Sequence, residues 1–308
     1  MADNKRSNPR RDERARHAAR HIADVENRLA SEVAASVAGL RAYDSTPSVA
    51  PAVDAGAPRV PSVTVVDEDS ATAVLERGRG LASACDLAVL DFASFTSVGG
   101  GYDRGAWAQE EAMCAESTLY NALATQKAWY AENRHRNINC ELYRNRALVV
   151  PRVRFDRAKY HSYADVIVAA APNARRAREE YRVSDEALLC AMRSRIRMVL
   201  AIADDLGHPK LVLGAFGCGV FGWDASQVAE MFREELAAGG HVASEVVFAV
   251  PRGRFDENLE RFEHAFAKFP EANADAYVTR AERQAAAASA AVADEDDEEG
   301  EDDWRKYL

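Results

Sequence analysis

Two neighbouring glutamates follow three consecutive glycines, with eight residues between the two groups. The stretch runs Gly99-Gly-Gly101, then Tyr-Asp-Arg-Gly-Ala-Trp-Ala, then Gln109-Glu-Glu111. Adjacent glycines let the backbone approach a ligand at dihedral angles that a Cβ forbids. The carboxyl groups of Glu110 and Glu111 would place proton transfer beside that ligand. The pattern therefore indicates an acid-catalysed reaction on a phosphorylated or nucleotide-like substrate.

Helical spacing places the two glutamates on different faces of the expected helix. Glu111 shares a helix face with apolar Ala115 and Leu119, at steps of four, whereas Glu110 shares its face with Cys114. This phase predicts that Glu111 is the more inward carboxylate and the general acid. One alternative stays open: both acids would only stabilise the N-terminus of their helix through its dipole.

A second glycine-rich turn, Gly217-Cys218-Gly219-Val220-Phe221-Gly222, lies between an expected strand and an expected helix. Its spacing fits a dinucleotide-binding fingerprint, but it comes late in the chain and the next strand ends in Ala-Val-Pro251 without a ribose-binding acid. Phosphate binding by backbone amides and the following helix N-terminus survives that objection. Phe221 would either pack in the core or orient a sugar ring.

Polar residues at two strand ends are further candidates. Asp91 ends an apolar run before the first glycine loop, and Asn173 follows another expected strand. Each would either cap a turn or contact substrate. The chain has no serine-hydrolase elbow, zinc-peptidase helix or phosphate-binding Gly-Lys-Ser/Thr loop, which disfavours those classes of enzyme.

The segments that must position these residues alternate between strand and helix. Apolar runs predict strands at 60–66, 87–92, 147–153, 163–171, 210–216 and 245–251. Helical periodicity predicts helices at 21–40, 69–79, 106–129, 184–206, 225–237, 255–269 and 281–293. This alternation is typical of an α/β sandwich with a mixed, mainly parallel sheet.

Composition divides the chain into a core and two tails. We expect an N-terminal extension and linker over residues 1–59, disordered over its basic first twenty residues, and a catalytic domain over 60–270. Residues 271–308 form a helical, then acidic tail, and nine acids between Asp294 and Asp303 supply most of the net charge of −10. No apolar run is long enough to span a bilayer, and no secretory signal is seen, so we expect no membrane partner.

The cysteines and histidines indicate neither disulfides nor metal. Five isolated cysteines favour a reducing cytoplasm over a disulfide framework. The seven histidines have no metal-ligand spacing, apart from His17 and His21 on a polar stretch, where the sequence gives little reason to expect metal. We therefore expect no metal, no cofactor and no direct nucleic-acid binding.

The combined motifs resemble the microbial-type poly(ADP-ribose) glycohydrolases, whose catalytic domain is a macrodomain. The matching segments are specific in glycines, spacing and acids, and extend over roughly residues 60–269: Asp91-Phe-Ala-Ser94, Gly99-Gly-Gly101, Gln109-Glu-Glu111, Cys114, Ser117-Thr-Leu-Tyr120, Ala171-Pro-Asn173, Leu213 to Gly222 and Val246-Val-Phe-Ala249. The resemblance implies a three-layer α/β/α macrodomain-like sandwich.

The resemblance also implies roles. Glu111 would protonate the ribose–ribose leaving oxygen and then activate water, and Glu110 would bind the ribose hydroxyls. The first glycine loop (Gly99, Gly100 and Gly101) would lie against the terminal ribose with Asp91 and Gln109 nearby. The second loop, Gly217 to Gly222, would hold the diphosphate, with Phe221 on the ribose. ADP-ribosylated proteins or free poly(ADP-ribose) would be the partners.

The chain departs from the family pattern at three places. Asp91 stands where the family usually has Asn, Ser97-Val98 where it has Asn-Pro, and Trp223 where it has a small polar residue. An ionised Asp accepts hydrogen bonds but cannot donate one to a ribose hydroxyl. Two alternatives to poly(ADP-ribose) hydrolysis therefore stay open. One is a silent reader, that is, a non-catalytic module that binds ADP-ribose, and the other is a hydrolase of mono-ADP-ribose or free ADP-ribose derivatives.

Overall fold

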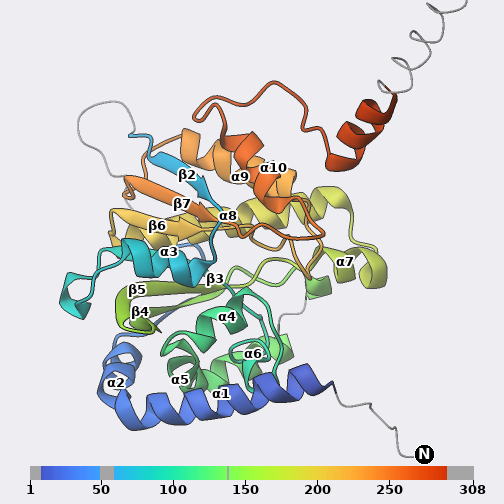
Figure 1. The fold of residues 1–308 in the computed structure, drawn as a ribbon. Coiled ribbons are helices and arrows are strands. Elements are labelled where there is room, and N and C mark those ends of the chain that lie inside the picture. The colour runs from blue at the N-terminus through green and yellow to red at the C-terminus, as the bar shows by residue number, and fades with distance from the viewer. Residues whose placement is uncertain (1–7, 49–58, 137–138, 290–308) are drawn as a thin grey trace, which may run out of the picture.

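A seven-stranded mixed sheet forms the middle layer of the molecule (Figure 1). In the computed structural model the chain is described over residues 8–48, 59–136 and 139–289. The strand order is β1-β4-β5-β3-β6-β7-β2. The strands are β1 (Arg41–Tyr43), β2 (Ser62–Val66), β3 (Leu87–Phe92), β4 (Ala147–Arg157), β5 (Tyr160–Ala169), β6 (Lys210–Leu213) and β7 (Glu245–Ala249).

Five neighbouring strands, from β5 through β3, β6 and β7 to β2, run parallel, and β4 is antiparallel to both β1 and β5. The central strands are apolar on both faces because helices cover both sides of the sheet. Consequently the loops after β3, β6, β7 and β2 leave the sheet at one edge. In open parallel sheets, ligands bind outside that carboxyl edge.

Helices form the two outer layers (Figure 1). One core cluster joins the sheet to α7 (Ala174–Tyr181), α8 (Asp185–Leu206), α9 (Ala225–Ala237) and α10 (Asn258–Phe266). The other contains residues of α1 (Pro9–Arg28), α2 (Ala30–Ala38), α3 (Ser70–Arg77), α4 (Gln109–Ala115) and α5 (Leu119–Leu123). Short 3-10 turns lie at η1 (Ala82–Ala84), η2 (Tyr102–Arg104), η3 (Ala124–Gln126) and η4 (Asn139–Glu141), and α6 (Lys127–Arg136) follows η3. The expected three-layer α/β arrangement is confirmed.

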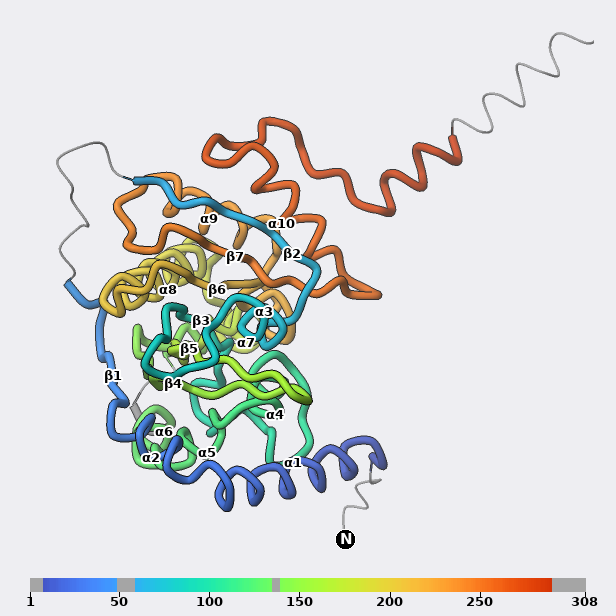
Figure 2. The backbone as a smooth tube through the Cα atoms, turned by 60° about the vertical axis from the view of Figure 1, so that its left-hand side comes forward, coloured from blue at the N-terminus to red at the C-terminus, as the bar shows by residue number. Residues whose placement is uncertain are grey.

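Residues 8–20 are ordered and packed, contrary to the expectation of disorder over residues 1–20. Helix α1 begins at Pro9, with Asn8 as its N-cap, and lies along one side of the domain (Figures 1 and 2). Arg11 and Arg14 donate to the carbonyls of Arg104 and Gly105, each at 2.9 Å. The basic composition misled the prediction because these arginines bind backbone carbonyls. Residues 1–7 lie outside the described part of the chain.

The expected linker after residue 43 begins beside the sheet, because Tyr43 ends β1, which pairs with β4. The rest of that linker, at 49–58, lies outside the described residues, as do 290–308 of the acidic tail. Whether residues 60–270 form the catalytic domain by themselves stays a prediction, but α1 and β1 both pack against that segment. None of the helices described here is long and apolar enough to cross a membrane.

The prediction of a single helix over 106–129 is wrong. The segment is divided into α4, α5, η3 and α6, and it is interrupted after Ala115. At the break, Thr118 N–H donates to the Arg154 carbonyl at 3.0 Å and Asp156 N–H donates to the Glu116 carbonyl at 2.8 Å. Strand β4 thus takes backbone hydrogen bonds that a continuous helix would have kept for itself. Strand β1 and helix α7 were not expected from the sequence.

Candidate active site

A cleft of about 590 Å³ opens at the carboxyl edge of the parallel strands. Its wall combines the start of α4, the loop after β6, the loop after β7 and the beginning of α3. Sequence reasoning predicted five of its lining residues: Gln109, Gly217, Gly219, Val220 and Phe221. The remaining predicted site residues are not part of this wall, and the acids among them form a buried group beside the first glycine loop.

The first glycine loop is built around the carboxylate of Glu111. Gly101 N–H donates to Glu111 Oε1 at 2.9 Å. Gly100 has φ +63°, and a Cβ placed on it would lie 2.4 Å from Glu111 Oε1 and 2.9 Å from Glu110 Oε2. A side chain at this position would therefore displace both carboxylates, which explains why the loop requires glycine here.

Glu110 is buried more deeply than Glu111, so the helical-phase prediction ranked the two acids wrongly. Glu110 is 2% exposed and Glu111 6% exposed. Ser94 N–H donates to Glu110 Oε2 at 2.7 Å, while Glu110 Oε1 has no hydrogen-bond partner among the described residues. Burial, together with the charges of Asp91 and Glu111, raises the pKa of Glu110 well above its ordinary value.

Asp91 completes a group of three carboxyls, which we call the acid cluster (Asp91, Glu110 and Glu111). Its side chain is fully buried at the end of β3, and neither carboxyl oxygen has a hydrogen-bond partner within the described ranges. Burial, with the nearby charge of Glu111, raises the pKa of Asp91 well above its ordinary value. Crowding of carboxyls in a low-dielectric interior therefore favours the protonated forms of Asp91 and Glu110.

Gln109 has a structural role that the sequence did not reveal. Its Oε1 accepts from Phe92 N–H at 2.8 Å, and its Nε2 donates to the carbonyl of Leu90 and to Ser70 Oγ, each at 3.0 Å. The side-chain amide thus joins the start of α4 to β3 and α3. Although Gln109 lines the cleft, its side-chain amide is hydrogen-bonded within the protein. These hydrogen bonds position the two glutamates that follow it.

The second glycine loop presents free backbone donors. Over the residues that the structure covers, the amides of Gly219, Val220 and Phe221 donate to no protein acceptor. Gly217 and Gly222 have φ of +80° and +75° and so permit the sharp turns on either side. Consecutive N–H groups in such a turn form a concavity suited to an anion. Cys218 points its thiol at the Phe216 carbonyl, at 3.7 Å, and does not line the cleft.

The helix after this loop does not present a free N-terminus, contrary to expectation. Asp224 is the N-cap of α9 and accepts from Gln227 N–H at 3.0 Å, while its second oxygen accepts from Arg261. A capping carboxylate satisfies an N–H group and adds negative charge where an anion would sit. The backbone N–H groups of the loop are thus better placed than the helix N-terminus to donate hydrogen bonds to a phosphate.

Trp223, one of the departures from the family pattern, anchors the second loop. Its indole is buried, and Nε1 donates to the Pro172 carbonyl at 2.8 Å. Its backbone N–H donates to the Gly217 carbonyl at 3.2 Å, closing the loop on itself. Asn173 caps α7 by accepting from Arg176 N–H at 3.2 Å, which realises the turn-capping alternative.

Aromatic residues that sequence reasoning did not select line the cleft as well. They include Phe92 and Phe216, which are 5.6 Å apart between ring centroids, and the exposed Trp107. Phe221 is partly buried and meets Tyr143 edge-on at 6.4 Å, so it both packs against the core and faces the cleft. Phe92 directly follows Asp91 and Phe216 directly precedes Gly217, so their position beside the motifs was the available signal.

Comparisons with known proteins show the family of this chain. A family model described as microbial-type PARG, catalytic domain, matches residues 15–158, beginning inside α1. A solved poly(ADP-ribose) glycohydrolase from Thermomonospora curvata is 30% identical, with a TM-score of 0.68, over 83% of this chain and 100% of that one. The enzyme from Deinococcus radiodurans is 29% identical, with a TM-score of 0.61, over 75% and 95% of the two chains. None of the curated proteins matches. The chain belongs to the microbial-type poly(ADP-ribose) glycohydrolase family.

Proposed function

We propose that this protein hydrolyses the ribose–ribose O-glycosidic bonds of poly(ADP-ribose) and releases ADP-ribose, with Glu111 as general acid and base. The solved relatives include the T. curvata enzyme bound to the inhibitor ADP-HPD and the D. radiodurans enzyme in complex with ADP-ribose. The cleft of this chain, with free amides at one side and carboxyl groups beside it, supports binding of the same class of ligand.

One observation favours Glu111 as the reacting acid. Exposure rises through the acid cluster from 0% at Asp91 to 2% at Glu110 and 6% at Glu111. Glu111 is thus the most exposed of the three carboxyls, which supports it as the group that exchanges a proton with substrate. Gly101 N–H holds Oε1 in place, and Oε2 accepts no hydrogen bond from any described residue. That second oxygen is the proposed site of proton transfer.

The proposed reaction has two steps. The Glu111 carboxyl gives its proton to the oxygen that links the two riboses, and the bond from that oxygen to the anomeric carbon breaks. The resulting oxocarbenium ion is stabilised by the diphosphate held at the second loop. The Glu111 carboxylate then takes a proton from water, whose oxygen bonds to the anomeric carbon. Proton transfer of this kind contributes about 10²–10⁴-fold to the rate.

Glu110 and Asp91 are proposed to accept and to donate hydrogen bonds, respectively. Glu110 Oε1 is unpartnered in the described protein and is proposed to accept from ribose hydroxyls. The raised pKa of Asp91 favours its protonated carboxyl, the form that donates a hydrogen bond as an Asn amide does. This property favours an active hydrolase over a silent reader, because the substitution retains a donor.

Incubation with poly(ADP-ribosyl)ated protein, mono-ADP-ribosylated protein and free ADP-ribose esters, followed by mass spectrometry, tests the proposal. We expect ADP-ribose release from the polymer, loss of release in Glu111→Gln, and unchanged release in Glu76→Gln, an exposed glutamate of α3. ADP-ribose binding without turnover by the unmodified chain would support a non-catalytic ADP-ribose-binding module. Release only from the mono-modified protein or the esters would support a hydrolase of mono-ADP-ribose or free ADP-ribose derivatives. Full activity of Glu111→Gln would refute the mechanism.

A further inference from the structure

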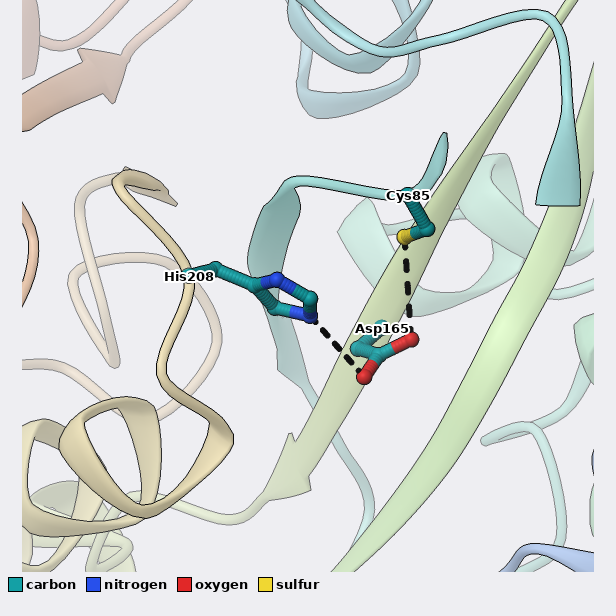
Figure 3. A group of neighbouring side chains, drawn as sticks. All are labelled: Cys85, Asp165 and His208. Carbon is teal, nitrogen blue, oxygen red and sulfur yellow. Dashed lines mark hydrogen bonds and ion pairs between the residues drawn. The ribbon is translucent and has the colours of Figure 1, made fainter. Parts of the chain in front are cut away.

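A second group of reactive side chains lies at the opposite edge of the sheet from the cleft. Cys85 precedes β3, His208 precedes β6, and Asp165 lies on β5, where it pairs with Ala88 near the start of β3 (Figure 3). Strands β3 and β6 begin at this edge and end at the cleft. The three side chains therefore belong to neither the acid cluster nor the phosphate-binding loop.

Their ligand atoms converge. His208 Nε2 lies 3.0 Å from Asp165 Oδ2, Cys85 Sγ lies 3.7 Å from Asp165 Oδ1, and all of the ligand atoms are within 4.8 Å of one another. Around a tetrahedral Zn²⁺ with bonds of about 2.0–2.3 Å, ligand atoms stand roughly 3.3–3.8 Å apart. The observed spacing needs an adjustment of about an ångström at most. Among the residues that the structure describes, this is the one group of His, Cys and acidic side chains with such spacing.

We infer that Cys85, Asp165 and His208 form a binding site for a thiophilic divalent cation of the Zn²⁺ class, with a fourth position open to water. A thiolate, an imidazole and a carboxylate are the three ligand types that Zn²⁺ takes from proteins. With the thiol proton released on binding, the set carries two negative charges and neutralises the ion. The inference does not depend on the proposed function.

The surroundings are compatible with a bound cation. Asp86, which adjoins Cys85, pairs with both Arg79 at 2.9 Å and Lys210 at 3.1 Å, so these two basic side chains have a carboxylate partner outside the trio. Arg152 N–H donates to Asp165 Oδ1 at 2.8 Å and fixes the carboxylate. Such outer contacts orient metal ligands. A bound ion would connect the loops before β3 and β6 to β5 and stabilise the amino edge of the parallel strands.

A hydrogen-bonded trio that never binds metal is the competing explanation, and metal titration separates the two. The chelator-treated full-length protein is titrated with Zn²⁺ by calorimetry and with Co²⁺ by absorption spectroscopy. We expect one Zn²⁺ per chain, a thiolate-to-cobalt charge-transfer band, and a higher Tm with Zn²⁺ than without it. Ligand loss in Cys85→Ser or His208→Asn should weaken binding by about 100-fold or more, since even outer-contact losses cost 10–100-fold.

Cys190→Ser is the matched control, because Cys190 is an exposed free cysteine on α8. It should bind Zn²⁺ and Co²⁺ as the unmodified chain does. The His208→Asn side chain can still donate to Asp165, and circular dichroism checks that each variant folds. The inference fails if the unmodified chain gives no cobalt–thiolate band, or if the band and the affinity persist in Cys85→Ser.

Discussion

Replacement of Gly100 by alanine tests whether the first glycine loop exists to position the two glutamates. The added Cβ would lie 2.4 Å from Glu111 Oε1, 3.0 Å from the Glu111 carboxyl carbon and 2.9 Å from Glu110 Oε2. A carbon–oxygen contact needs about 3.3 Å. The Glu111 carboxylate must therefore move by about an ångström, and the 2.9 Å hydrogen bond from Gly101 N–H is strained or lost.

The expected effects on stability and activity differ in size. Gly100 has φ +63°, where an alanine costs about 1–2 kcal/mol. The clashing atoms are ends of flexible side chains, so they can move with little further loss of folding free energy. Catalysis has no such tolerance, because a displacement of about 1 Å costs roughly 10²-fold in rate. Gly100→Ala should thus lose about 100-fold in kcat while remaining folded.

Gly240→Ala provides the matched control. Gly240 has φ +86°, but nothing lies within 4 Å of the Cβ it would receive. Both variants should lose similar unfolding free energy in urea titrations, and only Gly100→Ala should lose ADP-ribose release. Equal activity in the two variants would refute the reasoning that the loop positions the carboxylates by steric fit.

Three other substitutions probe the neighbouring features. The pKa of Asp91 is raised in the folded state, so the folded protein holds the proton that the unfolded chain releases, and stability falls as pH rises above the ordinary aspartate value of 3.8. Relative to the unmodified chain, the unfolding free energy of Asp91→Asn should therefore rise by up to about 1.4 kcal/mol per pH unit in that window. If urea titrations show a difference between the two proteins that does not change with pH, the pKa of Asp91 is not raised. Gly105→Ala would place a Cβ 2.0 Å from the Arg11 carbonyl oxygen, so α1 should lift and limited trypsin digestion should cut it faster; unchanged digestion would argue against its docking. Trp223→Phe leaves the buried Pro172 carbonyl unpaired, which should cost about 1–3 kcal/mol in thermal unfolding and weaken ADP-ribose binding measured by calorimetry.

The sheet could be predicted from the sequence because its strands carry their own signal. Continuous apolar runs such as Leu87–Phe92 mark strands buried on both faces, and the observed bounds of β3 agree with the expected ones. The glycine loops were found because glycine is the residue type that their dihedral angles require. Gly100 and Gly217 do have positive φ, in agreement with that reading.

What could not be predicted depends on contacts between distant segments. The break before Ser117 depends on β4, through hydrogen bonds to residues 154 and 156. The docking of α1 depends on carbonyls about ninety residues away. Helical phase could not rank Glu110 and Glu111, because the loop covers α4 from the side that phase alone treats as exposed. The group formed by Cys85, Asp165 and His208 likewise arises only when three strands come together.

The acid cluster explains how an aspartate can replace the family's asparagine at position 91. An ionised carboxylate there would add a third negative charge beside two glutamates and near the diphosphate. Burial and the charge of Glu111 instead raise its pKa and so favour its neutral form. A neutral carboxyl offers one donor where an amide offers two, so the substitution preserves charge and one donated hydrogen bond but removes another. The cost of the departure should therefore appear in ribose binding before it appears in proton transfer.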